Sequence, residues 1–141
     1  MKINIDMAIR VTYFLLRVVA GVLFASTGGL ILFGWFGGMP DMPSPPPLLT
    51  QTGIGGILEF FGGIGIILGL ATRPVAFILS GMMAVAYWQF HAPMSRWPAQ
   101  NMGTPAILFC FIFLYMAAYG GGDWSLDALI RIKRGGTANA K

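Results

Sequence analysis

An apolar, glycine-rich segment, residues 53–73 (GIGGILEFFGGIGIILGLATR), most constrains how this chain can fold. It is long enough to cross a bilayer, which takes about 20 residues of helix. It also carries one carboxylate, Glu59, near its middle. A charged group at the centre of a membrane helix costs roughly 2.5–3.5 kcal/mol on insertion scales. The segment is therefore predicted to be a membrane span in which Glu59 faces other helices rather than lipid.

The composition of the whole chain favours the same class. Its 141 residues are 56% hydrophobic and only 10% charged, whereas soluble domains are about 25% charged. The net charge of +4 comes from bases at the ends of apolar segments, without the basic stripe of a nucleic-acid-binding surface. With one cysteine, Cys110, and one histidine, no disulfide within the chain and no metal-ligand set is expected. We therefore expect an integral membrane protein with no nucleic-acid partner and no intrinsic cofactor.

Four apolar segments separated by proline-rich or polar loops predict four membrane spans, at about residues 11–36, 53–71, 74–92 and 104–120. A cleaved signal peptide is the rival interpretation of the first segment. It is disfavoured because Arg17 interrupts the apolar stretch and no small-residue cleavage site ends it. The fold class expected is all-α, a four-transmembrane-helix bundle followed by a short interfacial amphipathic helix. Residues 1–134 form the single domain, and residues 135–141 form a flexible C-terminal tail.

The bases predict how the chain is oriented and where it meets the membrane surface. If the N-terminus is cytoplasmic, every loop or terminal base except Arg96 lies on the inner side, as the positive-inside rule requires. Both termini are then cytoplasmic. After the fourth span, apolar residues recur at helical spacing and are followed by three bases, Arg131, Lys133 and Arg134. This pattern predicts an amphipathic helix whose bases lie at the lipid headgroups.

Small residues indicate which helix faces meet. At about 100° per residue, glycines share one face in each of the first two spans: Gly21 and Gly28 in the first, and Gly55, Gly62, Gly65 and Gly69 in the second. Small side chains let membrane helices approach closely. Glu59 lies on the glycine face of the second span, so it is expected to point into a compact bundle.

Depth in the membrane suggests which residues accompany Glu59. At a rise of about 1.5 Å per residue, Glu59 lies about 7 Å along the membrane normal from His91 and about 12 Å from Arg17. We therefore expect a polar cluster of Glu59, His91 and Asn101 in the outer half of the bundle, with Arg17 as an alternative partner. A structural tie between helices and a functional site both remain open for Glu59. Arg17 has the further alternative of extending to the cytoplasmic surface.

Three motifs extend this pattern over most of the chain. They are residues 56–63 (GILEFFGG) with 68–73 (LGLATR), His91 followed by residues 98–101 (PAQN), and residues 122–127 (GDWSLD). Together with Arg17 and Gly21, these motifs resemble those of the DoxX family of small four-helix bacterial membrane proteins. The proline-dense loop at residues 40–47 departs from the family pattern.

The resemblance implies a multi-pass protein of the bacterial inner membrane that acts as a subunit of a redox complex. Two hypotheses follow. In the first, the chain is a non-catalytic accessory or structural subunit of a larger redox or bioenergetic complex. In the alternative, it is a quinone-linked oxidoreductase subunit of the thiosulfate:quinone oxidoreductase type, in which Glu59 and His91 bind a quinol. The expected partners are the membrane and other membrane subunits, with a quinone or a lipid as the candidate ligand.

Overall fold

The computed structural model describes residues 4–40 and 44–135, and these are helical with no strand. The expected all-α fold is confirmed. Length and apolar composition qualify α1 and α2 as membrane spans, while α4 is a shorter apolar helix. The flexible tail predicted at residues 135–141 lies, apart from its first residue, outside the described part of the chain. The elements in order are α1 (Ile5–Phe33), a 3-10 turn η1 (Trp35–Gly37), α2 (Gln51–Leu68), α3 (Thr72–Ala86), a π-helical turn η2 (Tyr87–His91), α4 (Thr104–Tyr119) and α5 (Leu126–Lys133).

Capping residues set the helix boundaries. α1 begins after Asn4 and α2 after Thr50, and each of these side chains accepts a backbone N–H from the first turn of its helix. Both helices end at a glycine with positive φ, Gly34 at 69° and Gly69 at 65°. As a result, α1 starts before the predicted residue 11 and α2 stops before residue 71. The third segment is helical from α3 through η2, close to the predicted range.

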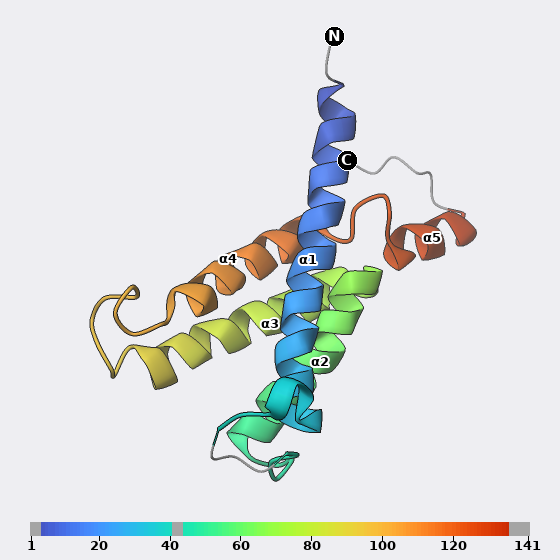
Figure 1. Cartoon of the computed structure of the whole chain (residues 1–141). Helices are drawn as coiled ribbons and strands as arrows, with labels where there is room; N and C mark the ends of the chain where they lie inside the picture. Colours follow the sequence, from blue (N-terminus) through green and yellow to red (C-terminus); the bar gives the residue numbers. More distant parts are fainter. Residues whose placement is uncertain (1–3, 41–43, 136–141) are drawn as a thin grey trace.

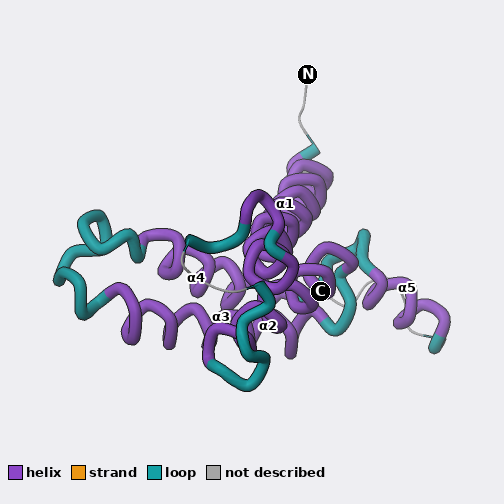
Figure 2. Tube along the Cα trace, turned by 60° about the horizontal axis from the view of Figure 1, so that its bottom comes forward, coloured by secondary structure: helices purple, strands orange, loops and turns teal. Residues whose placement is uncertain are grey.

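The four long helices form two pairs rather than four helices side by side. α1 packs along α2, and α3 packs along α4. Figure 1 shows the α3–α4 hairpin leaving the α1–α2 pair at a wide angle. In Figure 2 the hairpin and α5 again lie on opposite sides of α1. The compact bundle expected from the sequence is therefore replaced by two helix pairs that cross.

Glycines bring α1 and α2 into backbone contact. A Cβ built on Gly21 would lie 2.8 Å from the carbonyl oxygen of Gly63, and a Cβ on Gly63 would lie 2.8 Å from that of Gly21. Gly28 makes the same approach to Gly56, at 2.8 Å from its carbonyl oxygen. Because no side chain fits at these four positions, the helices approach as closely as small residues allow.

The second span uses a different glycine face from the predicted one in its contact with α1. Gly62 and Gly65 face α3, where a built Cβ would lie 2.8 Å from Leu79 and 3.6 Å from Val75. Gly55 has open space where a Cβ would lie. The predicted glycine set therefore divides between neighbours, because α2 is contacted by α1 on one side and by α3 on another.

The core lies where the two helix pairs cross. Phe24 of α1 packs edge-to-face against Phe113 of α4, with ring centroids 4.8 Å apart. Phe113 and Ile66 are fully buried. This crossing holds α4 against α1, and it lies nearer to the α2–α3 turn than to the far end of the hairpin (Figure 1).

Candidate functional site

The α2–α3 turn is held by a carboxylate from the other end of the chain. Asp127, in the first turn of α5, accepts backbone N–H groups from Ala71 at 2.7 Å and Thr72 at 2.8 Å. The Asp127 N–H in turn donates to the Gly69 carbonyl at 2.9 Å. The N-cap residue of α3 makes no side-chain cap of its own. The Asp127 carboxylate therefore caps α3, where a negative charge also interacts favourably with the helix dipole.

Arg17 holds the other side of the same turn. Its side chain is only 1% exposed. Nη1 donates to the carbonyl oxygens of Ile66 and Ile67, both at 2.6 Å, and Nη2 donates to that of Trp124 at 2.6 Å. Ile66 and Ile67 belong to the last turn of α2, where carbonyl groups do not accept an N–H from the residue four positions on and a positive charge is stabilising. The structure thus places the Arg17 guanidinium at the C-terminus of α2 and not in contact with Glu59. The Arg17 side chain does not extend to the surface.

Gly69 makes this arrangement possible. Its φ of 65° is a conformation that other residues rarely adopt. A Cβ there would lie 2.7 Å from Nη1 of Arg17 and would also collide with Ser125. Arg17, Gly69, Trp124, Ser125 and Asp127 are named here the turn cluster. The cluster joins α1, the α2–α3 turn and α5.

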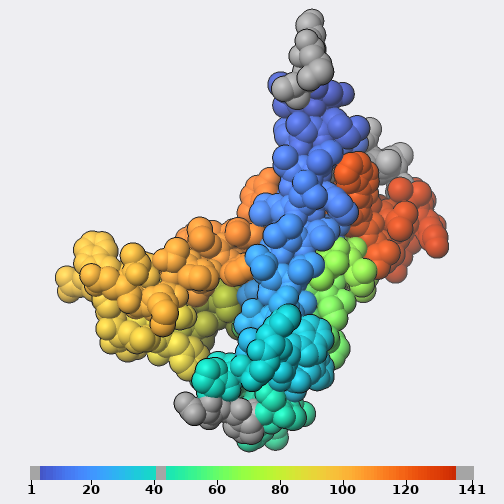
Figure 3. Space-filling view, in the orientation of Figure 1, coloured from blue at the N-terminus to red at the C-terminus, as the bar shows by residue number. Residues whose placement is uncertain are grey.

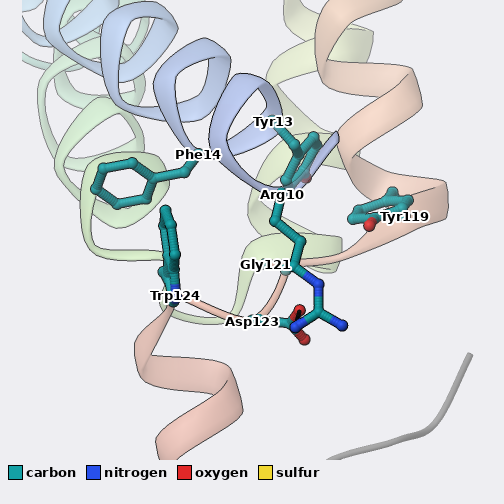
Figure 4. A pocket seen from close by; sticks show the side chains of 8 residues that line it. Arg10, Tyr13, Phe14, Tyr119, Gly121, Asp123 and Trp124 are labelled. Carbon is teal, nitrogen blue, oxygen red and sulfur yellow. Dashed lines mark ion pairs between the residues drawn. The ribbon is translucent and has the colours of Figure 1, made fainter. Parts of the chain in front are cut away.

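A second set of contacts surrounds the turn cluster. The buried Tyr13 hydroxyl donates to the Gly120 carbonyl. Arg10 of α1 forms an ion pair with Asp123, with Nη1 and Oδ2 3.1 Å apart. Figure 4 shows Arg10 reaching Asp123 beside the edge-to-face rings of Phe14 and Trp124. Because both charged partners are about half exposed, this ion pair contributes little to stability.

At the far end of the α3–α4 hairpin, the structure brings together two of the three residues of the predicted cluster. The Nδ1 atom of His91 lies 2.9 Å from the Asn101 carbonyl oxygen. Because a carbonyl oxygen only accepts, Nδ1 carries the hydrogen of this bond, and Nε2 has no hydrogen-bond partner among the described residues. Asn101 is fully buried, with Nδ2 donating to Ser95 and Oδ1 accepting from the Gly103 N–H. Asn101 therefore organises the loop and orients the His91 ring.

Glu59 is not joined to that pair. Its Oε2 atom is buried and has no hydrogen-bond partner, and no ion pair to Glu59 occurs among the described residues. Figure 1 shows η2, which carries His91, at the end of the α3–α4 hairpin that projects from the α1–α2 pair. A hydrogen bond from Gln51 at the start of α2 to Gln89 joins α2 to η2. Glu59 thus presents a buried, unpartnered carboxylate oxygen.

The side chains of the described residues limit the chemistry that is possible near Glu59 and His91. They contain no group of three or more His, Cys, Asp or Glu side chains placed to hold a metal ion. Cys110 lies beside Ser80, whose hydroxyl donates to the Cys110 carbonyl at 2.8 Å. Glu59 and His91 can exchange a proton or accept a hydrogen bond, so they suit a small ligand that carries hydroxyl or carbonyl groups.

Sequence reasoning missed the role of Asp127, which it named only within the GDWSLD motif. Its signal was present, because Ala71-Thr72-Arg73-Pro74 opens a helix with no capping side chain before it. Thr72 is another residue that was missed; it is fully buried and its hydroxyl has no partner. No local pattern links residue 72 to residue 127, so the pairing emerges only from the fold.

Two apolar helices long enough to span a bilayer and the close glycine contacts between them are typical of a small helical membrane protein. Comparison with known proteins gives its family: residues 12–92, more than half of the chain, match the DoxX family model. The chain belongs to the DoxX family.

Two bacterial proteins are similar in sequence to this chain. An uncharacterized protein of Haemophilus influenzae is 42% identical over 77 residues, which cover 52% of this chain and 58% of that protein. The inner membrane protein YqjF of Escherichia coli K12 is 26% identical over 125 residues, 83% of this chain and 90% of that protein. The aligned part thus spans little more than half the length of the Haemophilus relative. No solved structure matches the chain.

Proposed function

We propose that the chain is an accessory, structural subunit of a larger membrane complex of the bacterial inner membrane, in the redox or bioenergetic class. The observation that carries this proposal is the α3–α4 hairpin, which projects from the α1–α2 pair as a separate arm (Figure 3). Large apolar side chains on this arm are exposed, among them Phe77, Ile78, Val85, Leu108 and Phe111.

Glycines on the uncovered surface support a protein partner. Gly21, Gly56 and Gly63 all contact a neighbouring helix, but Gly81 of α3 and Gly55 of α2 face open space. Small residues are enriched where membrane helices meet, because they allow close approach. The exposed face that includes Gly81 therefore fits a transmembrane helix of another subunit.

Photo-crosslinking in native membranes tests this proposal. p-Benzoylphenylalanine is placed at Val85, which is exposed one helical turn from Gly81, or at Leu15, an exposed position on α1 that serves as the control. We expect a discrete adduct to another membrane subunit from Val85 and none from Leu15. The chain purified in mild detergent should also run above its own mass of 15.2 kDa plus micelle. Adducts only to lipid, or only to a second copy of the chain, would contradict the proposal.

A second candidate function is favoured by a separate observation. Oε2 of Glu59 lies unpartnered on α2, which is apolar and long enough to span a membrane, and His91 lies on η2 with only its Nδ1 in a hydrogen bond among the described residues. We propose as the alternative that these groups serve a quinone-linked oxidoreductase subunit, in which they bind the hydroxyl or carbonyl groups of a quinol. A ligand bound between α2 and the hairpin would supply the hydrogen bond that Glu59 lacks.

Substitutions at the two candidate residues test this alternative. Glu59→Gln and His91→Ala are compared with Asp123→Asn, which removes a carboxylate at the opposite end of the molecule. Quinone-dependent turnover is measured in membranes that contain equal amounts of each protein. We expect both site variants to lose turnover and the control to keep it. Unchanged turnover in both site variants would remove the alternative and leave the accessory role standing.

A further inference from the structure

A groove of about 860 Å³ opens at the end of the molecule where α2 turns into α3. The start of α1, the start of α3, the end of α4 and the start of α5 form its walls. Its charged lining comprises three arginines and three aspartates: Arg10, Arg73, Arg131, Asp6, Asp123 and Asp127. With equal numbers of both signs, the groove is suited to a ligand that carries both charges rather than to a simple anion.

Half of these charges are already used by the protein. Both Asp127 carboxylate oxygens accept backbone N–H groups of the α2–α3 turn, and Asp123 pairs with Arg10. Among the described residues, Arg73 makes only a long hydrogen bond of 3.5 Å, to the Tyr119 carbonyl. Arg131 and Asp6 form no ion pair there. Two arginines and one aspartate thus remain available to a ligand.

The groove also lies at the edge of the apolar surface. Pro74, Ala118 and Tyr119 line it together with the charged groups. Directly beyond them, Phe77 of α3 and Tyr115 of α4 are more than half exposed. Tyrosine at the boundary between an apolar surface and a polar one is typical of the headgroup level of a bilayer. A ligand in the groove would therefore have one end in the headgroup layer and one end towards the acyl chains.

We propose that this groove binds the headgroup of a phospholipid that carries a phosphodiester and a primary ammonium, the chemistry of phosphatidylethanolamine. Arg73 and Arg131 bind the phosphate, because planar guanidinium groups donate paired hydrogen bonds to phosphate oxygens. Asp6 accepts hydrogen bonds from the ammonium group. A quaternary choline has no N–H to donate, and a glycerol headgroup has no positive charge to offset Asp6, so both bind more weakly.

Native mass spectrometry of the full chain tests the site. The protein in dodecylmaltoside micelles receives equal amounts of dioleoyl phosphatidylethanolamine, phosphatidylcholine and phosphatidylglycerol. We expect one retained phosphatidylethanolamine adduct, favoured about tenfold over each of the others, since one charged hydrogen bond accounts for a difference of that size. The Arg73→Gln/Arg131→Gln double variant should lose the adduct. Asp6→Asn should keep an adduct but lose the preference over phosphatidylcholine.

A matched control removes the same charge elsewhere. The Lys133→Gln/Arg134→Gln double variant also lacks two positive charges, but neither residue lines the groove. It should bind the lipid as the wild type does, and all variants should keep the wild-type helical circular dichroism. Equal loss in this control, or equal retention of the three lipids by the wild type, would overturn the proposal. Displacement of the lipid by soluble phosphorylethanolamine at equal concentration would instead assign the groove to a soluble ligand, and would also overturn it.

Discussion

Removal of the Asp127 carboxylate tests whether the turn cluster holds the fold together. In Asp127→Ala, the N–H groups of Ala71 and Thr72 lose acceptors that lie at 2.7 and 2.8 Å. Loss of an N-cap side chain costs roughly 0.5–2 kcal/mol. Loss of a negative charge at a helix N-terminus costs about 0.3–1 kcal/mol more. We therefore expect the free energy of unfolding to fall by about 1–3 kcal/mol. Asp127→Asn keeps one acceptor oxygen without the charge, so its loss should be smaller.

The measurement is a titration from dodecylmaltoside into mixed micelles with sodium dodecyl sulfate, followed by circular dichroism. Asp123→Ala is the matched control. It also removes one carboxylate, four residues before Asp127, but from an ion pair that is about half exposed. Exposed ion pairs contribute about 0–1 kcal/mol, so this control should unfold close to the wild type. Equal destabilisation by the two substitutions would refute the reasoning, because the loss of stability would then come from the change in net charge and not from loss of the α3 cap.

Three further predictions use the same titration. Gly63→Ala should lower the free energy of unfolding by about 1–3 kcal/mol, because its Cβ would lie 2.8 Å from the Gly21 carbonyl oxygen. Gly55→Ala should be neutral or stabilising, because a Cβ there has open space. Equal effects of the two substitutions would contradict the α1–α2 contact. Arg17→Gln should lower the free energy of unfolding by at least about 2 kcal/mol, since hydrogen bonds to a charged group contribute about 1.5–3 kcal/mol each. Wild-type stability of this variant would contradict the role of Arg17 at the C-terminus of α2. Phe113→Ala should cost about 3–5 kcal/mol if the helix pairs are held at this crossing, and a small effect would place the core elsewhere.

Features that depend on composition and short spacing were predictable from the sequence. The all-α fold, the membrane class and the C-terminal amphipathic helix follow from apolar segment length and from the spacing around Leu126. The helix ends at Gly34 and Gly69 were missed by a few residues, although a glycine at the end of an apolar helix is itself a stop signal. These errors are those of boundary placement within correctly identified helices.

Features that depend on the crossing angle of the helices were not predictable. The helical period shows which glycines share a face of a helix, but it does not show which neighbouring helix that face contacts. Gly55, Gly62 and Gly65 were therefore assigned one shared role that the structure divides. The depth estimate that placed Glu59 close to His91 assumed parallel helices, whereas the α3–α4 hairpin leaves the α1–α2 pair at a wide angle (Figure 1). The Asp127 cap depends on residues 56 and 55 positions apart, so no local pattern announces it.

Glu59 differs from the other residues of the family motifs in its contacts. Arg17, the residues of LGLATR and those of GDWSLD meet in the turn cluster, and their contacts explain them as ties that hold α1, α2, α3 and α5 together. Glu59 has no such contact among the described residues, although it lies in the GILEFFGG motif and is costly to bury. One carboxylate oxygen of Glu59 is therefore buried without a hydrogen-bond partner in the described part of the chain. Because no described group pairs with that oxygen, we expect Glu59→Gln to leave the unfolding titration unchanged while Asp127→Ala shifts it. A clear loss of stability in Glu59→Gln would instead show that the carboxylate ties helices together.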